Sequence, residues 1–135
     1  MITIEKMNQF SKGTMVENLG IEFLEVREGY LSAKMPVDNR TVQPYGILHG
    51  GASVALAETL GSVGAQFMVD QEKYICVGQE INANHIRSAR EGYVTGVAQP
   101  IHVGRTSQVW EIKITDENDK LVCISRITMA VLEKK

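Results

Sequence analysis

The feature that most constrains the fold is a long run of small and apolar residues from Gln43 to Gln66. After a turn at Pro44 and Gly46, the run is rich in alanine and leucine, which favour a helix, and it is too long for one strand. Because the run is apolar on every face, it predicts a helix that is buried all round. Polar residues and glycines interrupt it, so it does not predict a membrane span.

Glu58 is the only charged side chain between Arg40 and Asp70. A carboxylate in a buried helix must be hydrogen-bonded, paired or protonated, because its removal from water is costly. No lysine or arginine lies within helical reach of it. Two interpretations remain: a carboxylate that a hydroxyl or backbone group merely satisfies, and a general base or nucleophile in a dry pocket. We favour the second, because Ser62 places a hydroxyl one turn away on the same face.

The start of this helix favours an oxyanion site. Gly50 and Gly51 leave the first backbone N–H groups unobstructed at the positively polarised end of the helix. Such donors suit the negative charge that develops on a carbonyl oxygen under attack. The alternatives are that the glycines only permit a tight turn and that His49 only caps the helix.

The spacing of these groups predicts an oligomer. Glu58 follows Gly50 by eight residues, which is about 12 Å along a helix axis. Glu58 therefore cannot reach a carbonyl bound at the start of its own helix. If both groups act on one substrate, a second copy of the helix must run antiparallel beside the first. The sequence thus predicts a two-fold dimer whose active sites are shared between subunits.

Length and composition indicate an ordinary globular chain. With 135 residues we expect one domain, residues 1–135, with a core of its own. A net charge of −2 gives no general attraction to nucleic acid or to an anionic membrane. Cys76 and Cys123 are expected to be free thiols in a reducing cytoplasm, since no signal peptide precedes them. The histidines and cysteines are too scattered to predict a metal site.

The remaining sequence predicts an α+β fold. A short helix capped by Thr3 is expected to end near Gly13, and a further helical turn to run from Thr14 to Gly20. Six segments have the alternation of strands, and they place an antiparallel sheet against one long helix. These predicted strands are Ile21–Arg27, Tyr30–Val37, Tyr74–Ile86, Tyr93–Val103, Thr106–Thr115 and Leu121–Leu132.

Three segments carry a resemblance to a known family: MPVDNRTVQPYGILHGGASVALAETLGS, GQEINANHIRSAREG and PIHVGRTSQVWEI. Through them the chain resembles the hotdog-fold acyl-CoA thioesterases of the phenylacetate type, over nearly its full length. The resemblance implies a hotdog fold, in which an antiparallel sheet wraps around one long central helix. Within the family the chain is most similar to the 1,4-dihydroxy-2-naphthoyl-CoA hydrolases of menaquinone synthesis. The enterobactin proofreading thioesterases are close relatives of those hydrolases.

The resemblance also implies roles for individual residues. Glu58 matches the catalytic carboxylate, which acts either as a nucleophile through a mixed anhydride or as a base for water. Gly50 matches the residue whose backbone N–H polarises the thioester carbonyl. Gln43 and His49 match the polar pair that positions the reacting centre, and Ser62 matches the hydroxyl that helps to place water. In the family the glutamate and the glycine come from different subunits.

Two loops are candidates for binding coenzyme A, whose charges lie in its nucleotide phosphates. A glycine lets the backbone approach a phosphate closely, while arginine and hydroxyl groups bind phosphate oxygens. We expect both loops to lie at the mouth of one pocket, which Gly78 also lines. The predicted binding residues are Gly78, His85, Ile86, Arg87, Ser88, His102, Val103, Gly104, Arg105, Thr106 and Ser107.

The expected function is hydrolysis of an aromatic acyl-CoA to the free acid and coenzyme A in the cytoplasm. Neither a metal nor an organic cofactor is expected, because oxyanion donors and a carboxylate suffice for attack by water. By resemblance the chain is expected to form a homotetramer, a dimer of dimers. Two alternatives stay open: a proofreading thioesterase that acts on a misacylated acyl or aryl carrier protein, and a hotdog protein that binds acyl-CoA without turnover. The presence of Glu58 argues against the second.

Overall fold

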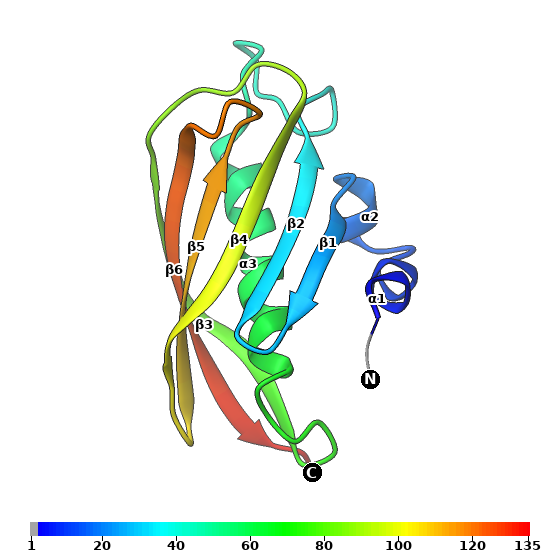
Figure 1. The fold of residues 1–135 in the computed structure, drawn as a ribbon, viewed down its shortest axis with the longest axis vertical. Helices are drawn as coiled ribbons and strands as arrows, with labels where there is room; N and C mark the ends of the chain where they lie inside the picture. The colour runs from blue at the N-terminus through cyan, green and yellow to red at the C-terminus, as the bar shows by residue number, and fades with distance from the viewer. Residues whose placement is uncertain (1–2) are drawn as a thin grey trace.

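A six-stranded antiparallel sheet curls around one long helix, α3 (Gly50–Gln66), in a computed structural model that describes residues 3–135 (Figure 1). The strand order is β1-β2-β4-β5-β6-β3, so β1 and β3 are the two edges. This arrangement confirms the predicted α+β class and the hotdog fold. The strands are β1 (Glu22–Arg27), β2 (Tyr30–Pro36), β3 (Tyr74–His85), β4 (Tyr93–Val103), β5 (Ser107–Thr115) and β6 (Leu121–Glu133).

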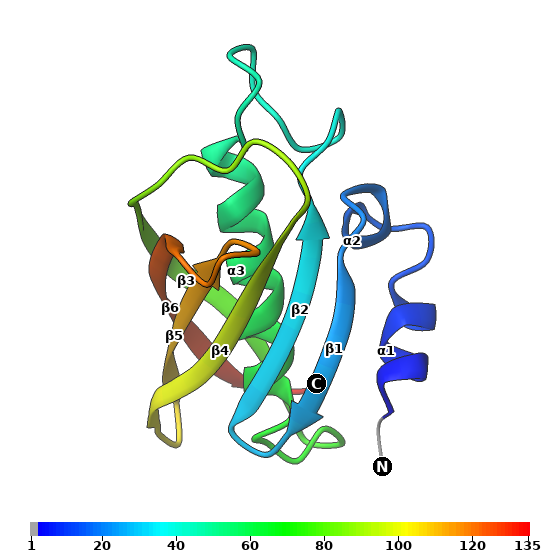
Figure 2. The same ribbon diagram turned by 45° about the horizontal axis from the view of Figure 1, so that its top comes forward.

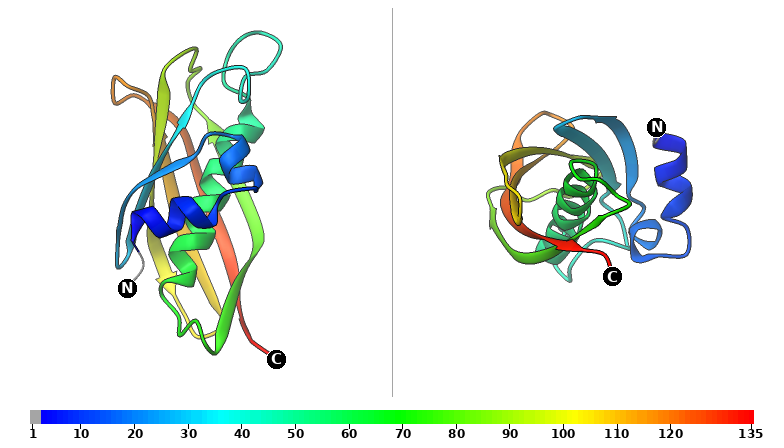
Figure 3. Two further views of the ribbon diagram at one scale, coloured as in Figure 1. Left: turned by 90° about the vertical axis from the view of Figure 1, so that its right-hand side faces the viewer. Right: turned by 90° about the horizontal axis from the view of Figure 1, so that it is seen from below.

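The bounds of the six predicted strands agree with the structure to within one residue, whereas the first helix ends at Phe10, three residues before the expected end near Gly13. The two short N-terminal helices are α1 (Ile4–Phe10) and α2 (Met15–Asn18), and each is capped by a threonine side chain as expected. Gly20 has a φ of 75°, a left-handed conformation that favours glycine and ends the second helix. Both helices lie beside β1, outside the curled sheet (Figures 2 and 3).

Small residues let α3 approach the inner face of the sheet closely. A Cβ at Gly61 would lie only 2.5 Å from Cγ2 of Ile127, and one at Gly64 only 2.8 Å from Cζ3 of Trp110. Since real Cβ atoms do not approach that closely, any larger residue would push the helix off the sheet. The residues of α3 that are buried in this contact are Ala52, Ser53, Leu56, Ala57, Leu60, Gly61, Gly64 and Ala65.

The other face of α3 is not covered by the chain. Val54, Ala55 and Ser62 are half-buried, and Glu58 is exposed. The prediction of a helix buried on every side is therefore wrong for the single chain. Apolarity on all faces shows that a helix can be covered all round, but it does not show whether the same chain provides the cover. Among residues 3–135, no helix has the length and apolar composition needed to cross a membrane.

Candidate active site

The structure gathers three of the predicted site residues into one group, which we call the carboxylate patch: Glu58, Ser62 and Gly78. A Cβ at Gly78 would lie 2.7 Å from Oε2 of Glu58, so the glycine leaves room for the carboxylate against β3. The Ser62 hydroxyl lies 3.9 Å from Sδ of Met129, and Met129 is paired with Gly78 across β3 and β6. Glu58 and Ser62 therefore lie over the same part of the sheet. This part of β3 is irregular, with a register shift between Gly78 and Glu80, and such bulges often re-aim side chains at functional sites.

A second group of predicted residues lines a cavity of about 300 Å³, which we call the helix-start cavity. It lies at the N-terminus of α3, where the chain leading into α3 and the segment after β3 come together at one end of the sheet (Figure 2). The cavity is lined by Gln43, Ile47, Leu48, Gly50, Ser53, His85, Ile86, Arg87, Ser88 and Val122.

Gly50 lies beneath the imidazole of His85. A Cβ at Gly50 would lie 2.8 Å from Nε2 of His85, so only glycine fits there without a shift of the histidine. No group among residues 3–135 accepts a hydrogen bond from the Gly50 N–H. Gly50 thus offers a donor at the positive end of a 17-residue helix, beside a cavity. This is the geometry that an oxyanion site requires.

His49 caps α3 with its ring. Its Nδ1 accepts a hydrogen bond of 2.8 Å from the Gly51 N–H, and its own backbone N–H donates to the Thr41 carbonyl at 2.8 Å. His49 therefore is the N-cap of α3, as one of the two interpretations of the sequence expected. A neutral His49 that accepts at Nδ1 carries its proton on Nε2. Of the two glycine N–H groups expected to be available, only that of Gly50 remains so.

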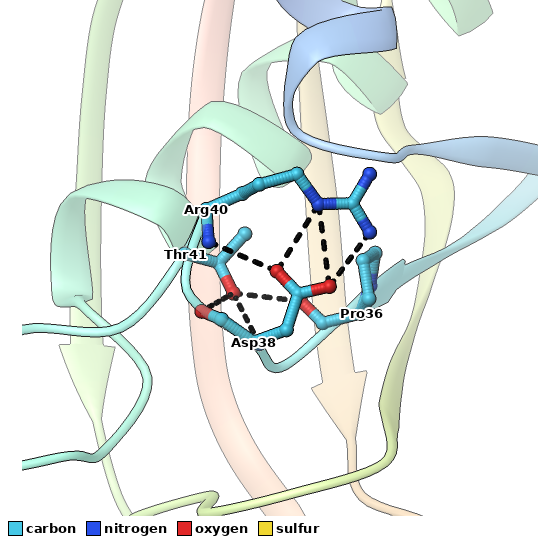
Figure 4. A network of polar contacts seen from close by, with 4 residues as sticks. All are labelled: Pro36, Asp38, Arg40 and Thr41. Atoms are coloured by element: carbon cyan, nitrogen blue, oxygen red, sulfur yellow. Dashed lines mark hydrogen bonds and ion pairs between the residues drawn. The ribbon is translucent and has the colours of Figure 1, made fainter.

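The loop that delivers Gln43 to the cavity is fixed by a compact polar network (Figure 4). The Arg40 guanidinium pairs with Asp38 at 2.7 Å, and the Thr41 hydroxyl donates to the Pro36 carbonyl at 2.7 Å. The hydrogen bond from the Arg40 side chain is the main reason why the pKa of Asp38 lies below its ordinary value. Beyond this network, Oε1 of Gln43 accepts from the Tyr45 N–H, whereas the Gln43 amide nitrogen donates to no group among residues 3–135.

The segment after β3 is attached to the start of β6. Ile86 and Arg87 both donate backbone hydrogen bonds to the Val122 carbonyl, at 2.8 and 3.3 Å. The turn between β5 and β6 lies close by: backbone hydrogen bonds, first that of Lys120, lower the pKa of Asp116, and Arg87 adds a smaller attraction. Arg87 is exposed, so its charge is available at the rim of the helix-start cavity.

The other predicted loop, His102–Ser107, lies elsewhere. It is the hairpin between β4 and β5, at the opposite end of the sheet from the segment after β3 (Figure 1). Within the hairpin the Gly104 N–H donates to the Ser107 carbonyl at 2.8 Å, and His102 packs against Gly104. The two loops therefore do not meet within one chain, so they could flank one pocket mouth only if they come from two different subunits.

Comparison with known proteins gives the family. A profile described as the Thioesterase superfamily matches residues 45–123, which contain the carboxylate patch and all residues of the helix-start cavity except Gln43. The chain belongs to this superfamily. It is 53% identical over 131 residues to the 1,4-dihydroxy-2-naphthoyl-CoA hydrolase of Escherichia coli strain K12, an alignment that covers 97% of this chain and 96% of the relative. It is 51% identical to the proofreading thioesterase EntH of Cronobacter turicensis, covering 97% of this chain and 95% of that protein.

Solved structures agree with this assignment. A mutant of thioesterase PA1618 from Pseudomonas aeruginosa superposes with a TM-score of 0.97 at 48% identity, covering 99% of this chain and 96% of that one. Thioesterase HI1161 from Haemophilus influenzae superposes with a TM-score of 0.95, also at 48% identity, covering 98% of this chain and 92% of that one. The chain is therefore an enzyme of the thioester-hydrolase class.

Sequence reasoning missed several residues of the helix-start cavity. Ser53 could have been predicted from the sequence, because it follows Gly50 by one helical turn on the same face. Val122 could not have been predicted, because only the pairing of β3 with β6 brings it beside Ile86. The cavity residues without an earlier prediction are Ile47, Leu48, Ser53 and Val122.

The Asp38 network yields a pH-dependent prediction. The pKa of Asp38 is lower in the folded chain than the ordinary value of about 3.9, so its pairing stabilises the fold above that value and is lost as the pH falls through the folded pKa. Asp38→Ala should therefore lower the free energy of unfolding at neutral pH, and much less at about pH 2. Urea unfolding at both pH values measures this. The same comparison in an Arg40→Leu background is the control. There the pH-dependent part should shrink, because the side-chain hydrogen bond is lost and only the backbone N–H of residue 40 still donates to Asp38. Equal losses at both pH values in the chain with Arg40 would contradict the account.

Proposed function

We propose that this enzyme hydrolyses the thioester of an aromatic acyl-CoA similar to 1,4-dihydroxy-2-naphthoyl-CoA, releasing the free acid and coenzyme A. Two groups on α3 carry the proposal. Glu58 is an accessible carboxylate, and the Gly50 N–H at the start of the helix donates to no group among residues 3–135. The 53% identity to a hydrolase of that name supports the choice of substrate.

The reaction follows from these groups. The Gly50 N–H donates to the thioester carbonyl oxygen and stabilises the negative charge that develops there, aided by the dipole of α3. Glu58 then acts in one of two ways. It either attacks the carbonyl carbon and expels the coenzyme A thiolate, forming a mixed anhydride that water hydrolyses to the free acid and the Glu58 carboxylate, or it takes a proton from a water that attacks the carbonyl carbon and displaces the thiolate. Ser62 would orient that water, and the Gln43 amide and His49 would orient the acyl group. The chemistry requires neither a metal nor an organic cofactor.

The two groups must come from different subunits. Glu58 lies against β3 at Gly78, whereas Gly50 lies against it at His85, and Glu58 follows Gly50 by eight residues along the helix. Within residues 3–135 the edge strand β3 pairs with β6 alone. It is 12 residues long and exposes Ile75 (43%) and Val77 (40%). Long apolar edge strands of this kind pair with another chain unless they are protected. We infer a two-fold dimer formed along β3, which associates further into a tetramer.

Such a dimer would also reunite the two candidate coenzyme A loops. A two-fold axis perpendicular to β3 inverts the second copy, so the His102–Ser107 hairpin of one chain and the His85–Ser88 segment of the other come to the same end of the assembly. Arg87 and Arg105 would then supply cations for the nucleotide phosphates from opposite subunits. This arrangement explains why the two loops resemble one another in composition although they lie far apart in one chain.

A second candidate function is proofreading on a carrier protein. The 51% identity to a proofreading thioesterase named EntH favours it. The chemistry at Glu58 would be the same, and only the carrier of the thioester would differ. The ratio of kcat/KM for an aryl-carrier-protein thioester to that for the matching aryl-CoA distinguishes the two functions, because the physiological carrier should give the larger value.

The first test is the release of thiol from a panel of acyl-CoAs, from naphthoyl and benzoyl to short and long straight chains. Glu58→Gln should lower kcat/KM on the order of a thousandfold, about 4 kcal/mol of transition-state stabilisation. Glu25→Gln, an exposed carboxylate on the far edge strand β1, is the control and should leave turnover unchanged. Turnover by Glu58→Gln at the wild-type rate would exclude the proposed mechanism.

The shared site predicts complementation between two inactive variants. Gly50→Pro removes the N–H donor at the first helical position, where proline is tolerated, while Gly50→Ala introduces the same Cβ and keeps the donor. We expect Gly50→Pro to lose far more activity than Gly50→Ala. When Gly50→Pro and Glu58→Gln chains are refolded together, about a quarter of all sites should be intact, because half of the dimers are mixed and each has one complete site. No recovery of activity would mean that each site lies within one chain.

Two variants of His49 distinguish a capping role from a catalytic one. Asparagine is a good N-cap, so His49→Asn should retain most of the stability that His49→Ala loses, which is about 0.5–2 kcal/mol. If His49 also positions the acyl group, both variants should lose kcat to a similar extent. Urea unfolding and steady-state kinetics on the two variants measure this. Full activity of His49→Asn would assign the histidine to capping alone.

A further inference from the structure

Gln66, the last residue of α3, joins the helix to the edge strand β3 through both ends of its side chain. Its Nε2 donates to the Tyr74 carbonyl at 3.1 Å, and its Oε1 accepts from the Cys76 N–H at 2.9 Å. Both bonds go to backbone groups at the start of β3 that point away from β6, towards the free edge of the strand. One amide side chain therefore fixes the strand against the helix at two successive inward-facing positions.

The helix end that carries Gln66 is itself held in place. Gln108, fully buried on β5, donates to the Ala65 carbonyl at 3.2 Å and accepts from Nε1 of Trp110 at 2.8 Å. The Trp110 ring in turn lies against Gly64, where no Cβ would fit. Since β5 holds this end of α3, the two hydrogen bonds of Gln66 fix the start of β3 against the helix, together with a bond of 3.6 Å from the Cys76 thiol to the Ala65 carbonyl.

The position of β3 matters for the carboxylate patch. Cys76 precedes Gly78 by two residues on the same face of β3, and Gly78 is where the Glu58 carboxylate lies. At Gly78 the pairing with β6 shifts by one residue before it resumes at Glu80, so Gly78 lies at an irregular point of the ladder. On the helix, Gln66 follows Glu58 by two turns on the same face.

We propose that Gln66 is a positioning residue for the thioesterase reaction. By clamping the start of β3 to α3, it sets the distance between Gly78 and the helix and so the orientation of the Glu58 carboxylate. This inference rests on the proposed catalytic role of Glu58. A change at Gln66 should therefore act on kcat through Glu58, beyond any effect on folding.

The test compares Gln66→Met, which keeps the length of the side chain and removes both hydrogen bonds, with wild type. We expect kcat to fall about ten- to a hundredfold with little change in KM, because a displacement of the catalytic group by about 1 Å costs rates of that order. The matched control is Asn8→Leu. Asn8 on α1 accepts a 2.9 Å hydrogen bond from the Phe23 N–H on β1, so its loss removes a similar helix-to-strand bond at the opposite edge of the sheet. Asn8→Leu should lower stability and leave kcat unchanged.

A double variant separates failure of this inference from failure of the proposed function. Because Gln66 acts through Glu58, Gln66→Met should lower kcat little further in a Glu58→Gln background. Two results would overturn this inference and leave the proposed function standing. One is a loss of kcat from Gln66→Met that is as large in the Glu58→Gln background as in wild type. The other is a wild-type kcat for Gln66→Met when Glu58→Gln is inactive. Full activity of Glu58→Gln would overturn both proposals. If Gln66→Met does not fold, Gln66→Glu carries the same comparison, since it keeps the acceptor for Cys76 and loses the donor to Tyr74.

Discussion

The close approach of α3 to the inner face of the sheet is the contact on which the rest of the structure depends. It is possible because Gly61 and Gly64 present no side chain to Ile127 and Trp110. With the helix this near, strands from both halves of the chain can bend around it and bury the apolar residues of one side (Figure 3). A larger residue at either glycine would separate helix and sheet and open cavities along their whole contact.

The same packing explains why the functional groups lie where they do. A single curled sheet covers one side of α3 and ends at the edge strand β3. Glu58 and Ser62 therefore lie at the border between the covered and the open side of the helix, where Glu58 is exposed and Ser62 half-buried. An exposed carboxylate keeps its water and is a weak nucleophile and base. It becomes reactive when another surface removes that water. In the proposed dimer this surface is supplied by the second subunit, so that assembly and activation of Glu58 would be one event.

Much of the fold was predictable because its signals are local. The composition of residues 43–66 gave the helix, and the strand Tyr93–Val103 was predicted with its observed bounds. Non-local features were not predictable. The pairing of β3 with β6, which brings Val122 to the helix-start cavity, joins segments that no periodicity connects. The exposure of Glu58 was missed for a related reason. An apolar pattern indicates that a helix is buried, but it does not show whether the same chain or a second one buries it.

The N-cap of α3, His49, determines which backbone N–H at the start of the helix stays available to a ligand. An N-cap side chain reaches the second or third N–H of its helix and cannot bond the first. His49 takes the second, that of Gly51, and leaves the Gly50 N–H as the outermost donor at the positive end of the helix. The capping bond also orients the imidazole, because its acceptor is Nδ1 and its Nε2–H must point elsewhere. Capping and positioning are thus compatible roles for one histidine: the bond that stabilises the helix leaves one backbone donor and one ring donor free for a ligand.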